Sequence, residues 1–221
     1  MTMDKITLRQ LVSQVVDRVP AQSDETLRSY IAGLPEAKIT MPTAELKVDE
    51  YIVSFRRYMD IVTKEGLLEV WLGRGKDEWL GYVRLDTNWN DSKDSKKKLW
   101  EITRAYIRPK YRGNNYSIFL CEVGINLAKK NKADASVAYP RHVAMLLTLI
   151  NYGFTTEAGT YDATLHRIAK QGHRWYRKNA SARRLYYAQE FRPFIQDGSF
   201  IMEKNLLTKS RGFWRFLWEK V

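Results

Sequence analysis

Cysteine and histidine are few in this chain, and no apolar stretch is long. Cys121 is the sole cysteine among 221 residues, so an internal disulfide is excluded, and its helical surroundings favour core packing over chemistry. The three histidines form no cluster with it, so no zinc site is indicated and we predict no metal. No run approaches membrane-spanning length, and residues 1–14 lack the apolar core of a signal peptide. We therefore expect a soluble, cytoplasmic protein without a membrane span.

Basic residues outnumber the acidic ones. The chain has 37 lysines and arginines against 25 aspartates and glutamates, which gives a formal net charge of +12. Such a balance suggests a polyanionic partner, although many basic proteins bind none. The length indicates either one domain with an insertion or a large domain with a small one. No feature of the sequence specifies an oligomeric state.

The stretch over residues 99–131 combines a strand, a short turn and a helix. Residues 99–107 mix aromatic, β-branched and polar side chains as a strand does, and Pro109 predicts its end. A turn over residues 111–115 follows, and then a mostly apolar helical pattern from Ile118 to Ala128. The first turn of a helix has unpaired N–H donors and a positive dipole end, so this arrangement is suited to an anion.

The residues of this stretch resemble the pyrophosphate-binding motif of the GNAT superfamily of acyl-CoA-dependent N-acyltransferases. The matching positions are Glu101, Ile102, Ile107, Pro109, Arg112 and Gly113. The resemblance implies an acyl-CoA co-substrate, acetyl-CoA or another, held by Ile107, Arg112, Gly113, Asn114, Asn115, Tyr116 and Ser117. Asn115 and Ser117 stand where the family has glycine and another small residue, and asparagine tolerates a left-handed backbone. An ordinary β-turn-α connection is the alternative.

Later segments extend the resemblance. Residues 135–139 predict a short buried strand, Pro140 fits the first turn of a helix, and that helix should stop at Gly153 in the family's closing G-F. Residues 200–207 resemble the family's last strand. The implied fold is α/β (α+β): a GNAT-like mixed central sheet flanked by helices, with a helical N-terminal lead-in and a basic helical insertion before the last strand.

The first part of the chain carries helical patterns. Apolar spacing predicts helices over residues 6–19, 23–34 and 43–62, the last preferred over a strand because its apolar residues recur at three and four. Residues 38–41 are the best candidate for a first strand. Residues 67–73 and 79–86 predict strands joined by a turn, and residues 88–98 a polar loop.

An insertion over residues 159–197 interleaves basic and aromatic side chains. Arginine pairs with phosphate and aromatic rings stack on bases, so we predict nucleic-acid contacts here. The predicted contact residues are Arg174, Trp175, Arg177, Lys178, Arg183 and Arg184. An amphipathic helix with inward aromatics and solvated arginines is the alternative. Residues 210–221 predict a short amphipathic helix.

Acyl transfer to an amine needs a base for the amine proton and an acid for the leaving thiolate. The resemblance places Glu101 where many members have the general base, while an ion pair with Arg104 or Arg84 is the alternative role. The family's acid, a tyrosine, is replaced here by Leu149, and the asparagine that often starts the same helix by His142. Tyr139 and Tyr152 are nearby substitutes for the acid, and we take Tyr139 as the catalytic candidate.

A shorter likeness is to the Mom family of phage DNA-modification proteins, which have a GNAT-like fold. It involves Glu101, Arg104, Asn114, Ser117, Phe119 and Leu120. This likeness agrees with the positive charge and the basic insertion, and it implies DNA as a partner.

The resulting hypothesis is an N-acyltransferase whose acceptor is an amine on nucleic acid, either a modified DNA base or tRNA. Acylation of a protein or a small amine is one alternative, and a non-catalytic acyl-CoA or nucleic-acid binding module is another. We expect one continuous domain with a helical part (1–63), a GNAT-like core (64–158), the basic insertion (159–197) and a last strand with a C-terminal helix (198–221).

Overall fold

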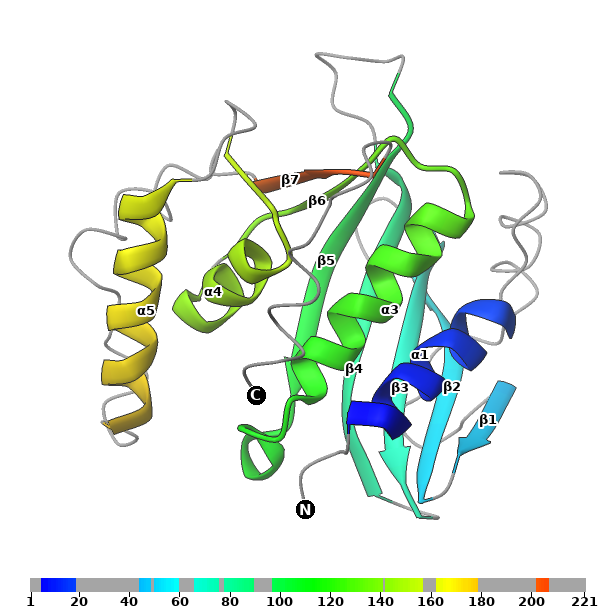
Figure 1. Cartoon of the computed structure of the whole chain (residues 1–221). Helices are drawn as coiled ribbons and strands as arrows, with labels where there is room; N and C mark the ends of the chain where they lie inside the picture. Colours follow the sequence, from blue (N-terminus) through cyan, green and yellow to red (C-terminus); the bar gives the residue numbers. More distant parts are fainter. Residues whose placement is uncertain are drawn as a thin grey trace. The chain divides into compact units, whose positions relative to one another are not determined.

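The chain folds into two compact units, 1–136 and 137–221, each of which is described by itself. The computed structural model describes residues 5–18, 44–48, 50–59, 66–75, 78–89, 97–140, 142–156, 162–178 and 202–206. Among the described residues, the first unit contains five antiparallel strands and two helices, and the second contains two helices and the last strand (Figure 1).

The first unit is built on antiparallel strands that neighbour one another in chain order. They are β1 (Ala44–Val48), β2 (Tyr51–Met59), β3 (Gly66–Arg74), β4 (Glu78–Trp89) and β5 (Leu99–Ile107). Short turns connect β1 to β2 and β3 to β4, as antiparallel neighbours allow. Gly75 adopts a left-handed φ of 61° in the second of these turns, and its N–H donates to Glu50 O over 3.0 Å. The two turns therefore lie side by side.

In the described part of this unit two helices pack together, and α3 lies on the sheet. The helix α3 (Tyr116–Lys130) runs along β4 and β5, and α1 (Lys5–Arg18) packs on α3 (Figure 1). Gly124 allows the close approach, because a Cβ there would come within 2.9 Å of Leu85 and 3.8 Å of Ile102. Leu85 and Ile102 are a register pair of β4 and β5, so these side chains define the face of the sheet that α3 covers.

A helical crossover makes the sheet mixed. After α3 the chain enters β6 (Ala135–Ala138), and two hydrogen bonds between Lys98 and Asp134 bring the start of β6 beside the start of β5. A strand–helix–strand connection of this kind joins parallel strands. The described strands and helices therefore confirm the predicted α+β class, a mixed sheet flanked by helices.

The second unit contains α4 (Val143–Asn151), α5 (Ala163–Lys178) and β7 (Met202–Asn205). The helices α4 and α5 pack on each other. His142 caps α4, because its Nδ1 accepts the N–H of Ala144 over 3.1 Å, and Gly153 ends the helix turn with a φ of 78°. Lys204 of β7 donates to Tyr152 O over 2.6 Å, which ties the last strand to the end of α4.

Most of the predicted elements are confirmed. The structure has a helix over 5–18, strands over 66–74, 78–89, 99–107, 135–138 and 202–205, and helices over 116–130, 143–151 and 163–178. The position of Pro140 is a correction: α4 begins only at Val143, so the proline precedes the first helical turn.

The helix predicted over residues 43–62 is wrong. This segment forms β1 and β2, which pair in the register Leu46↔Val53. Phe55 is buried on one face of β2, and Arg56 is buried on the other. The Arg56 guanidinium lies over the ring of Trp71, 4.5 Å from its centre. A strand buried on both faces loses the alternation that identifies it.

Some predictions lie outside the described residues. They are the helix over 23–34, the strand over 38–41, most of the polar loop over 88–98 and the C-terminal helix over 210–221.

Candidate active site

The centre of the candidate site is β5, where a bulge changes which side chains share a face. The register with β4 passes from Arg84↔Arg104 to Leu85↔Ile102, so Thr103 is an extra residue on β5. Ile102 lies under α3, and its neighbour Glu101 therefore points to the opposite face. Because of the extra residue, Arg104 lies on that same face as Glu101. Bulges of this kind re-aim side chains and are frequent beside active sites.

A second carboxylate faces Glu101. Asp86 of β4 is its register partner, so the two carboxyl groups lie on adjacent strands and the same face. Burial, and then the negative charge of Asp86, raise the pKa of Glu101 from 4.5 to about 7. A carboxyl group with a pKa near 7 is matched to accepting a proton at neutral pH.

The two arginines considered as partners of Glu101 are engaged elsewhere. Arg84 forms an ion pair with the buried Glu69 over 2.8 Å, and Trp71 Nε1 donates to the same carboxylate over 2.7 Å. The Arg104 guanidinium lies over Tyr82, 5.8 Å from its ring centre. Among the described residues, then, neither arginine forms an ion pair with Glu101.

The turn after β5 is held by its own hydrogen bonds. A short 3₁₀ turn, η1 (Pro109–Tyr111), ends the strand as expected from the proline. Arg112 Nε donates to Ile107 O over 3.1 Å, and Asn114 Nδ2 donates to Tyr111 O over 3.1 Å. These bonds fold residues 107–114 back on the end of β5.

Two left-handed residues shape the loop. Gly113 has a φ of 90°, and Asn115 has φ 62° and ψ 7°, the left-handed region that the sequence analysis expected asparagine to tolerate. Asn115 is the N-cap of α3, and its side chain makes no capping hydrogen bond. The Asn115 side chain therefore does not occupy an N–H donor at the start of α3, where a helix N-terminus can bind an anion.

The predicted cofactor residues lie together at this turn, with different roles for their side chains. Arg112 is exposed, and Ile107, Asn114, Asn115 and Ser117 are partly exposed. The Tyr116 side chain is buried and lies edge-on to Tyr51, with ring centres 6.2 Å apart. Tyr116 is thus a packing residue that brings only its backbone to the loop.

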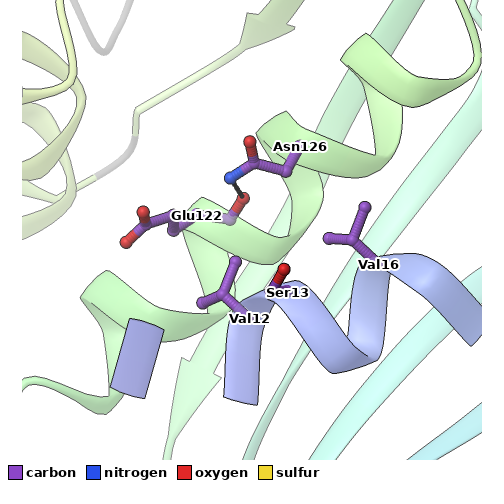
Figure 2. A pocket seen from close by; sticks show the side chains of 5 residues that line it. All are labelled: Val12, Ser13, Val16, Glu122 and Asn126. Carbon is purple, nitrogen blue, oxygen red and sulfur yellow. Dashed lines mark hydrogen bonds between the residues drawn. The ribbon is translucent and has the colours of Figure 1, made fainter. Parts of the chain in front are cut away.

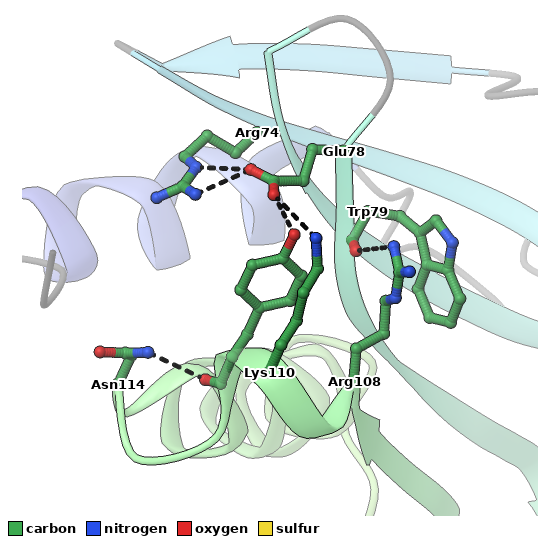
Figure 3. A network of polar contacts seen from close by, with 7 residues as sticks. Arg74, Glu78, Trp79, Arg108, Lys110 and Asn114 are labelled. Carbon is green, nitrogen blue, oxygen red and sulfur yellow. Dashed lines mark hydrogen bonds and ion pairs between the residues drawn. The ribbon is translucent and has the colours of Figure 1, made fainter.

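A charged network that sequence analysis missed anchors the turn to the β3–β4 hairpin (Figure 3). Glu78 accepts hydrogen bonds from Arg74 Nε and Nη2 at 2.9 and 2.8 Å, from the Tyr111 hydroxyl, and from Lys110 Nζ at 3.4 Å. These bonds, the one from Tyr111 first, lower the pKa of Glu78 to about 2. The carboxylate therefore stays charged at physiological pH and keeps its three partners.

Backbone contacts complete this anchor. The Arg108 N–H donates to Leu80 O over 2.9 Å, and Arg108 Nη1 lies 3.4 Å from Trp79 O (Figure 3). Gly81 lets β4 and β5 approach closely, because a Cβ there would lie 2.2 Å from Tyr106 O. No local signal in the sequence links residue 78 with residue 111, since 33 positions separate them.

A small hollow lies between α1 and α3, lined by Val12, Ser13 and Val16 of the first helix and by Glu122 and Asn126 of the second (Figure 2). Asn126 Nδ2 donates to Glu122 O over 2.9 Å within α3. The hollow is lined by helices on the face of the sheet that α3 covers, whereas Asp86 and Glu101 point to the opposite face, so the two are separate.

The remaining predicted site residues belong to the second unit. Tyr139 directly follows β6 and is partly exposed, and its catalytic role stays a prediction. Arg174 is exposed on α5, whereas the side chains of Trp175, Arg177 and Lys178 and the whole of residues 179–201 lie outside the described part. Leu149, which stands where the resemblance in sequence would place an acid, is fully buried.

The described residues include no group of three or more histidine, cysteine, aspartate or glutamate side chains placed to hold a metal. None of the helices in the described ranges is both long and apolar enough to cross a membrane.

Comparisons with known proteins give distant structural likenesses. No family model and no curated protein matches the chain. A structure from Lactobacillus plantarum, described as that of a candidate N-acetyltransferase, is 16% identical over 47% of this chain and 65% of its own, with a TM-score of 0.36. A GCN5-related glucosamine N-acetyltransferase region of a fungal multi-domain β-N-acetylglucosaminidase is 11% identical over 66% of this chain and 21% of its own, with a TM-score of 0.35. The chain thus spans less than two thirds of the length of either structure.

Proposed function

We propose that the chain is an acyl-CoA-dependent N-acyltransferase of the GNAT type, using acetyl-CoA or a related thioester, with an acceptor amine on nucleic acid. The observation that carries this proposal is the arrangement along β5. A carboxyl group with a pKa near 7 lies toward the start of the strand, and an uncapped helix N-terminus follows its end. Ile107 lies six positions after Glu101, a length of about 20 Å along the strand, which suits a long thioester carrier bound along β5.

The loop supplies the binding side of this proposal. The N–H groups of residues 113–117 and the positive end of α3 would hold the pyrophosphate, as helix N-termini hold phosphates elsewhere. Arg112, which is exposed, adds a positive charge at the same turn. The Glu78 network keeps the turn in place through Tyr111 and Lys110.

The chemical role falls to Glu101. In the proposed step the neutral amine attacks the thioester carbonyl carbon, a C–N bond forms, and the C–S bond breaks. Glu101 takes the amine proton, directly or through a water, and the thiolate leaves and is protonated to the free thiol. Burial of Glu101, and then the charge of Asp86, favour this role, because they keep the pKa of Glu101 high enough for the carboxylate to accept a proton.

The acceptor class rests on charge. The helix α5 has five basic residues and no acidic one, and the exposed stripe on its described surface includes Arg167, Lys170 and Arg174. The buried side of the helix consists of Leu165, Ile168 and Ala169, so the basic stripe is the face left to solvent. A basic stripe of this kind suits contacts with the phosphates of a nucleic acid, and such binding does not depend on the base sequence.

Calorimetry with acetyl-CoA tests the cofactor site. Arg112→Glu places a carboxylate beside the proposed pyrophosphate position and should abolish binding, whereas Lys132→Glu makes the same charge change at the exposed far end of α3 and should leave it unchanged. Absence of binding by the wild-type protein would reject the proposal. Equal binding by Arg112→Glu and wild type would show that this loop is not the acetyl-CoA site.

Nucleoside and intact-mass analysis tests the acceptor. DNA and RNA from cells that express the wild-type chain should carry a base heavier by one acyl group, and this product should be absent with Glu101→Gln. If acetyl-CoA binds but nucleic acid stays unmodified, a protein or a small amine is the better acceptor.

A non-catalytic binding module is the second candidate, and the buried Leu149 in the family's acid position favours it. In that case the chain binds acetyl-CoA, and wild type and Glu101→Gln release thiol at the same rate with every amine offered.

A further inference from the structure

One face of the sheet in the first unit combines arginines with aromatic rings. We call it the arginine–aromatic face, and it lies opposite the face that α3 covers. Its members are Arg56, Trp71, Trp79, Tyr82, Arg84, Arg104, Tyr106 and Arg108. Sequence analysis predicted none of this cluster, since its residues come from four strands and the turn after β5.

The rings of this face form a continuous group. Trp71 stacks on Tyr82 with ring centres 4.7 Å apart, and Trp79 lies 5.2 Å from Trp71. Tyr106 extends the group, 5.9 Å from Tyr82 and 6.0 Å from Trp79. A second bulge makes this possible: the register passes from Leu72↔Gly81 to Gly73↔Trp79, so Leu80 is an extra residue and Trp79 and Tyr82 share a face.

The arginines lie over these rings. Arg104 is 5.8 Å from the ring centre of Tyr82 and 5.9 Å from that of Tyr106, and Arg108 is 4.8 Å from that of Trp79. Arg84 has a carboxylate partner in Glu69. Within the described residues, Arg104 and Arg108 contact no carboxylate. Their guanidinium groups contact ring faces, and that of Arg108 also a backbone carbonyl.

Exposure and charge differ along β5. Trp71 and Tyr82 are buried, whereas Trp79 and Tyr106 are partly exposed and Arg104 is exposed. The carboxyl groups that face Arg104 along the sheet, Asp86 and Glu101, lie toward the start of the strand. The face thus has an acidic end with the proposed base and a basic end with accessible rings.

We propose that the basic end of this face binds single-stranded nucleic acid. Tyr106 and Trp79 offer ring surface for an unpaired base, and Arg104 and Arg108 present guanidinium groups to the flanking phosphates. An amine on a neighbouring base would then lie toward Glu101. The inference rests on the proposed function only in treating the bound strand as the acceptor; binding itself needs no acyl-CoA.

Three reasons favour a single strand over other polyanions. Accessible aromatic rings stack on bases only when the bases are unpaired. Guanidinium groups held on rings are pre-oriented for two-point contact with phosphate oxygens. An acidic peptide would satisfy the charges but would gain nothing from Tyr106, so dependence on that ring separates the two partners.

Fluorescence anisotropy with a labelled 12-nucleotide DNA strand, in the absence of acetyl-CoA and across a salt series, tests the inference. Arg104→Gln should weaken binding and flatten the log–log salt slope by about 0.7, the value for one phosphate contact on a single strand. Tyr106→Leu should weaken binding by roughly 5- to 150-fold with little change of slope. Tyr106→Phe keeps the ring and should bind as wild type does.

Lys132→Gln is the matched control, since it removes one positive charge from an exposed site at the far end of α3. It should change the slope less than Arg104→Gln does. Equal effects of the two variants would overturn the inference, because binding would then follow net charge alone. Binding of a poly-glutamate peptide that competes with DNA and depends equally on Tyr106 would also overturn it.

The test separates this inference from the proposed function. If the protein binds the strand through Arg104 and Tyr106 but fails to bind acetyl-CoA, the nucleic-acid surface is supported and the proposed acyltransferase activity is rejected. The reverse result would leave the acyltransferase with another acceptor. If Tyr106→Leu fails to fold, the slope difference between Arg104→Gln and Lys132→Gln still decides the matter.

Discussion

Replacing Glu101 by glutamine should stabilise the protein at alkaline pH. Glutamine has the shape of the protonated carboxyl group but cannot ionise. Burial and the charge of Asp86 raise the pKa of Glu101 from 4.5 to about 7, so its charged form is disfavoured in the folded chain. A shift of this size corresponds to about 3 kcal/mol before solvent screening, and to on the order of 1–2 kcal/mol after it, because the carboxyl group is partly exposed.

The pH dependence follows from the direction of the shift. Below pH 4.5 the carboxyl group of Glu101 is protonated in both the folded and the unfolded chain, so it costs nothing. Between pH 4.5 and about 7 the unfolded chain loses this proton first, and the wild-type protein loses stability as the pH rises. Above pH 7 the cost is fully present, so the difference between variant and wild type should reach its plateau there.

Thermal melting between pH 4.5 and 8.5 measures this difference. For a chain of this size, 1–2 kcal/mol corresponds to a rise in Tm of about 2–8 °C at pH 8, shrinking toward zero at pH 4.5. Asp86→Asn lowers the pKa of Glu101 and should move the midpoint of the effect to lower pH. Glu50→Gln, at an exposed turn carboxylate, is the control. A Tm difference that is constant across this range would refute the reasoning.

The same substitution also tests the chemistry once an acceptor is known. General-base catalysis contributes about 10²- to 10⁴-fold, so Glu101→Gln should lose kcat in that range while it keeps its affinity for acetyl-CoA. In the wild type, kcat/KM should rise with pH through an inflection near 7 and level off above it. Equal turnover by both proteins would exclude Glu101 as the base.

Three further predictions follow from the packing around β5. Gly81→Ala should lower the free energy of unfolding by about 1–3 kcal/mol or more, and with it the urea midpoint, because the new Cβ would lie 2.2 Å from Tyr106 O. An unchanged midpoint would contradict this close approach. Glu78→Gln should weaken acetyl-CoA binding in calorimetry, because it loosens the contact of residue 78 with Tyr111. The affinity of the wild type should stay constant from pH 8 to 4, since the pKa of Glu78 is about 2. Equal affinities of variant and wild type would show that the Glu78 network does not support the loop. Cys121 should resist a thiol reagent at pH 8 until urea unfolds the chain, because complete burial raises its pKa to about 12; rapid reaction in the native state would show access to α3.

The stretch from β5 to α3 was predictable from the sequence because its signals are local. Pro109 removes a ladder donor at the place where the strand ends, and the apolar spacing after residue 117 matches one helical face. The left-handed backbone at Asn115 is a conformation that asparagine was expected to tolerate. Each of these depends on neighbours within a few positions, so no knowledge of the fold was needed.

The failure over residues 43–62 shows where local signals end. Arg56 and Ser54 are polar, yet both are buried in β2, so the alternation of a half-exposed strand is absent. The aromatic and β-branched residues Tyr51, Ile52 and Val53 are typical of a strand, but apolar residues at spacings of three and four predict a helix. Pairing with β3 places Arg56 opposite Glu69 and brings its guanidinium to 4.5 Å from the ring centre of Trp71, and these tertiary contacts make the buried arginine tolerable.

By itself, the sequence of this protein determined the elements around β5, the residue types in the loop and the excess of positive charge. The tertiary structure decided the partners: Asp86 opposite Glu101, Glu78 against Tyr111, and Arg104 over the rings of Tyr82 and Tyr106. The physical reason is register. An extra residue at position 103 turns the remainder of β5 by one face, and the composition of a strand does not show where such a bulge falls.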